Sequence, residues 1–235
     1  MKISFSAQTN NSNVSSLEQK AHLIYKAFTP EGGKFFNSDV YVKNPDVLNS
    51  ALNALREINF AQSDVQKIER YGAKLIFKNG DDALKYLRKN DIEVVFDKVD
   101  TDDIHAQWIN SQNKIVINEK YRNTRSMAEI YAISAALFHE ISHAKDKDSI
   151  SSIQEEIDCL AMNALAFNVF LNKHPKIFNG NSSPIIKDGV ALYTNLFLGD
   201  DKQALMKRIK LKYGDLKLES PNHKASEFAK EIINS

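Results

Sequence analysis

The spacing of hydrophobic residues changes along the chain, and each spacing predicts one kind of secondary structure. Helical spacing, with hydrophobic residues three and four positions apart, covers residues 17–28 and 47–58, and Pro45 and Asp46 suit the start of the second helix. The segment before them, residues 1–14, is rich in Ser, Asn and Thr and cannot bury enough hydrophobic area to order itself. We therefore expect a disordered tail followed by a helical region.

A strand, a helix and a second strand are predicted next. Residues 73–78 form a short hydrophobic run between a glycine and an Asn-Gly turn pair, which is typical of a strand. The segment DDALKYLRKN then predicts a helix with Asp81 or Asp82 as its N-cap, and residues 92–97 predict the second strand. This order of elements favours an α+β fold.

The segment HAQWINSQNKIVIN predicts a β-hairpin. Its strands are residues 105–109 and 114–118, the polar turn NSQN joins them, and Trp108 is expected to pack on the hairpin. Together with the preceding strands, the hairpin predicts a small, mostly antiparallel sheet.

Two S-x-x-E capping boxes predict the starts of two long helices. Ser126 with Glu129 precedes a hydrophobic run, so we expect a long buried helix there. Ser152 with Glu155 opens a second helix, which is predicted to run to about Lys173. Three further helices are predicted between Gly- and Pro-marked breaks, over residues 185–198, 202–213 and 221–233.

These elements divide the chain into four predicted parts. They are a disordered tail, an N-terminal helical region, a catalytic core and a C-terminal helical part, at residues 1–14, 15–70, 71–175 and 176–235.

Composition and charge narrow the class of protein. Hydrophobic residues make up 43% of the chain, which suffices for a core, and 31 basic against 30 acidic residues leave a net charge of +1. This balance gives no reason to expect a nucleic-acid or membrane partner. The lone Cys159 excludes an internal disulfide, and no hydrophobic export signal or membrane-spanning run is visible. We expect a cytoplasmic protein, or an effector secreted without a Sec signal peptide.

The segment FHEISHAKD carries the most specific chemistry of the sequence. His139 and His143 are four positions apart, so on a helix both imidazoles leave the same face one turn apart and can bind one metal ion. Glu140 follows the first histidine, where it can act as the general base that takes a proton from a zinc-activated water. The HExxH pattern therefore predicts a single-zinc hydrolase.

A catalytic zinc ion takes three protein ligands, so one more donor is needed. The acidic pair Glu155 and Glu156 on the next predicted helix can supply it. We favour Glu156, because Glu155 is already explained as a member of the capping box. Asp158 is a further possibility, either as a ligand or as an acceptor for the ring N–H of a ligating histidine. For the donor that stabilises the oxyanion, Tyr193 and His223 are the candidates.

HEISH on a helix, preceded by QWINSQNKIVIN and followed by QEEIDCLAMNALAF, resembles the gluzincin branch of the zincin metallopeptidases. The resemblance covers residues 73–172 and names a clan that includes ImmA-like peptidases and the zincin domains of bacterial toxins and injected effectors. It implies a zincin-like fold, a Zn2+ cofactor and a third ligand from a glutamate on the following helix. Members often show Glu-x-x-Ala-Asp or Glu-x-x-Ala-Asn, whereas here Gln154 stands four before Asp158. Read as Glu-x-x-small, the pattern fits Glu156 with Cys159.

Three functions remain open from the sequence. The first is a zinc metallopeptidase whose peptide or protein substrate adds as a strand to the sheet, at residues 114–118 or at the hairpin as a whole. The second is an inactive zincin-like binding protein, and the third is a helical interaction protein in which HExxH is coincidental. The intact Glu140 favours the first over the second.

Overall fold

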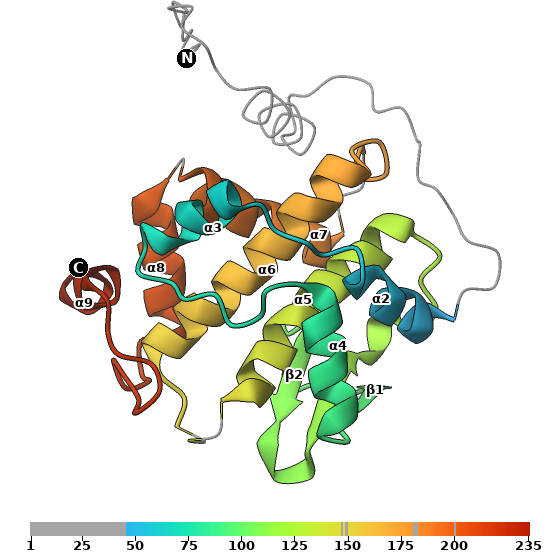
Figure 1. The fold of residues 1–235 in the computed structure, drawn as a ribbon, viewed down its shortest axis with the longest axis horizontal. Helices are drawn as coiled ribbons and strands as arrows, with labels where there is room; N and C mark the ends of the chain where they lie inside the picture. Colours follow the sequence, from blue (N-terminus) through green and yellow to red (C-terminus); the bar gives the residue numbers. More distant parts are fainter. Residues whose placement is uncertain (1–45, 147, 149, 181–182, 200) are drawn as a thin grey trace, which may run out of the picture.

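Two long helices, α5 (Met127–Lys145) and α6 (Ile153–Lys173), lie side by side in the middle of the molecule (Figure 1). This computed structural model describes residues 46–146, 148, 150–180, 183–199 and 201–235. The predicted tail and the predicted helix at 17–28 lie outside these residues. The remaining elements are α2 (Val47–Leu55), α3 (Gln62–Glu69), α4 (Gly80–Lys89), β1 (Glu93–Asp97), β2 (Ala106–Ile109), the 3-10 helix η1 (Asn110–Gln112), β3 (Lys114–Asn118), the 3-10 helix η2 (Glu119–Tyr121), α7 (Pro184–Leu192), the π-helical η3 (Tyr193–Leu198), α8 (Lys202–Tyr213) and α9 (Glu227–Asn234).

The sheet has three strands in the order β1-β3-β2. β2 and β3 form the predicted antiparallel hairpin, while β1 pairs with β3 in parallel. The α+β class is confirmed, but the prediction of a mostly antiparallel sheet is wrong, because the sheet is mixed. The hairpin reverses the chain, so β3 runs in the direction of β1 and lies between the two other strands.

The predicted strand at residues 73–78 is not formed. Its backbone is bound instead by side chains of α6: the Lys74 N–H donates to the Asp158 carboxylate at 2.9 Å, and the Gln154 side-chain amide donates to the carbonyl of Gly72 at 3.2 Å. Helix α4 follows as predicted, but Asn79 caps it rather than Asp81 or Asp82, since the Asn79 side chain accepts the N–H of Asp82 at 2.9 Å.

Most of the other predicted helices are confirmed with shifted ends. Asp46 caps α2, which ends at Leu55 rather than residue 58. The predicted helix at 185–198 is α7 followed by η3, and the one at 202–213 is α8. α9 begins only at Glu227, because the preceding residues form a loop in which the Ser220 N–H donates to the His223 carbonyl at 3.0 Å. α3 was not predicted as a separate helix.

Both central helices are buried on nearly all sides, which is why they rigidly fix the side chains they carry. The first is covered by α2, α4, α6, α7 and the hairpin, and the second by α7, η3, α8 and α9. The close approach of α7 to α6 depends on Gly189 of α7, where an added Cβ would lie 2.4 Å from the ring of Phe167 on α6. The hydrophobic core runs without a break from α2 to α9.

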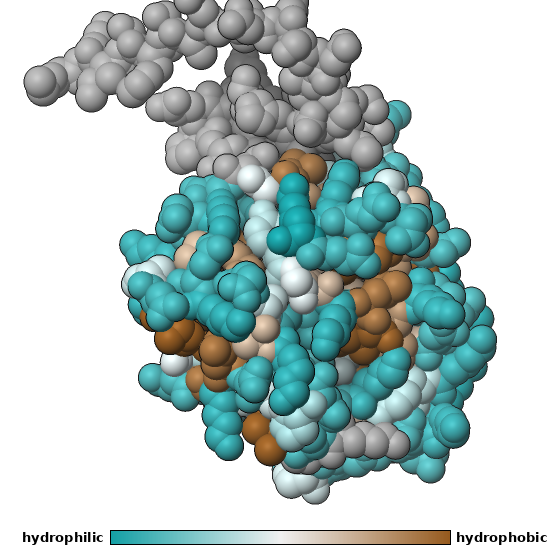
Figure 2. Space-filling model, turned by 60° about the vertical axis from the view of Figure 1, so that its left-hand side comes forward, coloured by the Kyte–Doolittle hydropathy of each residue, from teal (hydrophilic) through white to brown (hydrophobic). Residues whose placement is uncertain are grey.

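The surface on the side of α3, α8 and α9 is mainly hydrophilic, with hydrophobic residues in separate patches (Figure 2). Among the described residues, no helix is long and hydrophobic enough to cross a bilayer.

Candidate metal centre

Helix α5 brings His139 and His143 together near its C-terminal end. Ser126 begins this helix by accepting the N–H of Glu129 at 3.4 Å, and the unbroken helix then places the two imidazoles one turn apart. Their Nε2 atoms are 3.0 Å apart, and the rings meet edge to face with centroids 4.7 Å apart. Burial, together with the neighbouring His143, lowers the pKa of His139 to about 3, so His139 is a neutral donor at physiological pH.

Helix α6 supplies two carboxylates that contact different atoms of His143. Glu155 Oε1 lies 2.7 Å from Nδ1, whereas Glu156 Oε1 lies 3.6 Å from Nε2. Glu156 Oε2 lies 3.8 Å from the Nε2 of His139. Glu156 therefore faces both Nε2 atoms, with one oxygen toward each, and Glu155 contacts the opposite side of the His143 ring.

The donor set fits a zinc ion. The buried Oε2 of Glu156 has no hydrogen-bond partner within the described part of the chain. Two imidazole nitrogens and an unpartnered carboxylate oxygen, gathered in one buried place, are the donors that a catalytic zinc ion takes. The contact between Glu155 and Nδ1 of His143 is the carboxylate–histidine pair that orients a ligating ring and fixes its tautomer.

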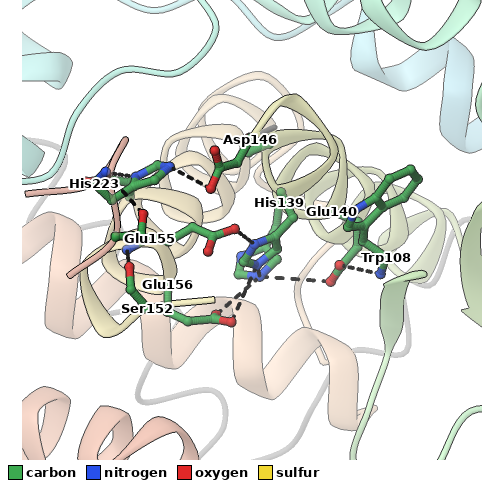
Figure 3. A network of polar contacts seen from close by, with 12 residues as sticks. Trp108, His139, Glu140, Asp146, Ser152, Glu155, Glu156 and His223 are labelled. Atoms are coloured by element: carbon green, nitrogen blue, oxygen red, sulfur yellow. Dashed lines mark hydrogen bonds and ion pairs between the residues drawn. The ribbon is translucent and has the colours of Figure 1, made fainter. Parts of the chain in front are cut away.

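Glu140 lies on the other side of His139 from Glu156 (Figure 3). Its Oε2 accepts the backbone N–H of Trp108 on β2 at 2.8 Å, and its Oε1 is 3.9 Å from the Nε2 of His139. Burial raises the pKa of Glu140 to about 7, and the negative charge of Glu156 adds to this shift. A carboxyl group with a pKa near neutrality, held by one oxygen, can take up and release a proton at the other.

Cys159 lies against His143 and Glu155 in the floor below the site. Burial raises the pKa of its thiol to about 12, so it remains protonated. Cys159 is thus a small core residue rather than a nucleophile.

Two elements that are far apart in the sequence form the walls of the cleft above these residues. β2 contributes Ala106, Gln107 and Trp108 to one wall, and the C-terminal end of α8 contributes Lys212 and Tyr213 to the other. Burial holds the pKa of Tyr213 well above its ordinary value, and the negative charge of Glu156 adds to this shift. Tyr213 is thus a protonated hydroxyl at the site.

Sequence reasoning missed Tyr213, because it ends a lysine-rich helix whose pattern indicates a solvated face. It named Tyr193 and His223 instead, and both assignments to the cleft are wrong. Tyr193 is buried in the core, where it stacks on Phe197 at a centroid distance of 5.3 Å. His223 lies between two aspartates, with Nδ1 at 2.7 Å from Asp158 and Nε2 at 3.5 Å from Asp146.

Asp158 is a structural centre and not a metal ligand. It is fully buried, and its two oxygens accept from the Lys74 N–H, the Gln154 side-chain amide and His223. These contacts join α6 to the segment after α3 and to the loop before α9. The alternative in which Asp158 completes the zinc site or orients one of its histidines is therefore wrong.

We expect Asp158→Asn to destabilise the fold by about 3 kcal/mol near pH 6, because it removes the nearer counter-charge of a buried imidazolium and leaves only Asp146, 3.5 Å from its Nε2. Burial lowers the pKa of His223, but its contacts with Asp158 and Asp146 outweigh burial and raise the pKa above the unfolded-state value of 6.5. The stabilisation from the charged His223–Asp158 pair is therefore complete below pH 6.5 and is lost as pH rises through the folded-state pKa. Urea unfolding of both forms at pH 6 and pH 9 measures this. If the loss of unfolding free energy in Asp158→Asn were as large at pH 9 as at pH 6, the assigned ion pair between His223 and Asp158 would be contradicted.

Comparison with models of protein families, with curated proteins and with solved structures found no match for this chain. The residues of the site therefore carry the functional argument.

Proposed function

We propose that the protein is a zinc-dependent metallopeptidase. The observation that carries this proposal is the convergence of His139, His143 and Glu156 at one buried point, with Glu140 held beside it and an open cleft above. A zinc ion held by these three residues would supply a Lewis acid that polarises a carbonyl and lowers the pKa of a water molecule.

Glu140 is the proton carrier of the proposed reaction. The Trp108 N–H holds Oε2, so Oε1, which is directed to the metal side, is the atom that takes the proton of the attacking water. The same atom then gives the proton to the leaving amine, and the carboxylate is regenerated. The hydroxyl of Tyr213 is the donor on the opposite wall and is the candidate for stabilising the oxyanion.

A peptide substrate fits the open edge of β2. β3 lies in the centre of the sheet, so residues 114–118 cannot receive an added strand, and that part of the sequence prediction is wrong. The Asn118 N–H donates to the His105 carbonyl at 3.0 Å, and the antiparallel alternation from this bond directs the backbone groups of Ala106 and Trp108 outward. Of these groups, the Trp108 N–H already donates to Glu140. Both residues line the cleft, so an extended peptide bound there passes over Glu140.

The proposal predicts about one zinc ion per chain. His139→Ala and His143→Ala each remove one of two nitrogen donors, so zinc affinity should fall by orders of magnitude. His174→Ala is the control, because His174 contacts Glu57 and Tyr131 away from the cleft. Metal analysis after dialysis measures this. Stoichiometric zinc in the double variant lacking both His139 and His143 would end the proposal in favour of a coincidental motif.

A further inference from the structure

Helix α8 places two basic side chains beside the proposed active site. Arg208 and Lys212 are one helical turn apart, and both line the recess that continues the cleft past His139 and Glu140. Lys212 also lines the main cleft next to Tyr213. Lys212 is therefore shared by the walls of the two spaces.

The other charged groups around this junction already have partners. Asp188 lies 2.9 Å from the Nε2 of His105 and 3.4 Å from Arg208. The acidic groups of the main cleft contact histidines: Glu155 and Glu156 contact His143, and Asp146 contacts His223. Asp103, at the edge of the recess, accepts from the hydroxyl of Thr101.

Lys212 differs from these groups. Within the described residues, its ammonium group forms no ion pair or hydrogen bond, and its one aromatic neighbour is the ring of Tyr213 at 5.2 Å. Its charge nevertheless reaches Asp188, a half-exposed carboxylate of the recess. The burial of Asp188 would raise its pKa, but His105, Arg208 and Lys212 outweigh that effect and lower it. Lys212 is thus an exposed, unpaired cation that lines both spaces.

The recess beside Lys212 has mixed walls, with apolar side chains on one part and the charged residues named above on the other. Its walls include Phe167, Ile185 and Leu192, and Asn163 adds an amide. A group that suits this space has a hydrocarbon stem and an anionic end. A carboxylate on a short aliphatic chain has this form, whereas a second cation would meet Lys212 and Arg208.

We propose that Lys212 is a specificity-determining residue that binds a carboxylate of the substrate next to the scissile bond. The carboxylate belongs either to an Asp or Glu side chain or to the C-terminus of the peptide. This inference rests on the proposed peptidase function. A charge-assisted hydrogen bond of this kind contributes about ten- to a hundredfold in kcat/KM.

Cleavage of a peptide library tests the proposal. The zinc-loaded full chain is incubated with proteome-derived peptides, one half with free and one half with amidated C-termini, and the products are identified by mass spectrometry. An acidic residue enriched at one fixed position from the cut identifies a side-chain carboxylate. Cleavage near the C-terminus of the free peptides alone identifies the terminal carboxylate.

Variants of α8 separate Lys212 from the general charge of the helix. Lys212→Met should lower kcat/KM for acidic substrates about tenfold or more, and Lys212→Glu should move the preference to basic residues. Lys207→Met makes the same charge change at another exposed position of the same helix, but Lys207 lines neither space, so the preference of this variant should match that of the wild type. No acidic preference in the wild type, or the same preference in Lys212→Met, would overturn the proposal.

Binding to an inactive form separates this inference from the proposed function. Zinc-loaded Glu140→Gln is titrated with fluorescent pools of Glu-containing and Gln-containing peptides of otherwise equal composition. The inference is supported if the Glu pool binds more tightly than the Gln pool and if this difference disappears when Lys212→Met is added to Glu140→Gln. That result supports the inference even if the wild type cleaves no peptide, in which case only the peptidase proposal fails. Equal binding of both pools overturns the inference, and cleavage by the wild type would still support the peptidase.

Discussion

Glu140→Gln should retain zinc and the fold but lower the rate of peptide hydrolysis by a factor on the order of a hundred or more. The amide keeps an oxygen that can accept the Trp108 N–H, so the side chain stays in place. It has no oxygen that can take up a proton, so the attacking water loses its base. Because the wild-type carboxyl group is buried with a pKa near 7, its replacement by a neutral amide should cost little stability.

The experiment compares turnover, zinc content and melting temperature in the variant and the wild type. Glu129→Gln is the matched control, since it makes the same change on the same helix, away from the cleft. We expect it to leave turnover unchanged. Loss of zinc from Glu140→Gln would make Glu140 a ligand and contradict its role as the base. Unchanged turnover with zinc still bound would contradict the proposed mechanism.

The N-cap signals and the alternation of hydrophobic residues were sufficient to predict the elements that carry the site. Ser126 and Ser152 cap α5 and α6 as their capping boxes indicate, and the hairpin has the predicted strands. These predictions depend on contacts within a few residues of the chain, which a single sequence displays.

Contacts between distant segments could not be predicted in the same way. The hydrophobic run at residues 73–78 has the composition of a strand, but Asp158 and Gln154 of α6 bind its backbone. The same limit applies to Tyr213, which reaches the cleft only because α8 packs against α6 and η3. Nothing in its own neighbourhood along the chain indicates a site.

Glu155 shows how a correct local prediction can conceal a second role. Its backbone N–H donates to the Ser152 hydroxyl at 3.2 Å, which is the predicted cap. This contact needs no carboxylate, and the carboxylate contacts Nδ1 of His143 instead. The capping argument therefore explains the backbone of Glu155 but not its side chain.

The two glutamates of α6 should consequently differ in how strongly they affect zinc binding. Glu156→Ala removes the carboxylate that faces both Nε2 atoms, so zinc affinity should fall by orders of magnitude. Glu155→Ala removes the acceptor that orients His143, which should lower affinity only about 10–100-fold.

Conservative variants make this comparison sharper, because they separate the two kinds of contact. Glu155→Gln keeps an oxygen that can accept from Nδ1 of His143, so it should recover most of the affinity lost in Glu155→Ala. Glu156→Gln replaces an anionic ligand by a weak neutral one and should recover little. Competition with a chromogenic chelator measures all four affinities, and melting of the metal-free forms shows whether each variant is folded. A larger loss in Glu155→Ala than in Glu156→Ala, with no recovery in Glu155→Gln, would reverse the assignment of the third ligand while leaving the histidine pair and the base in their roles.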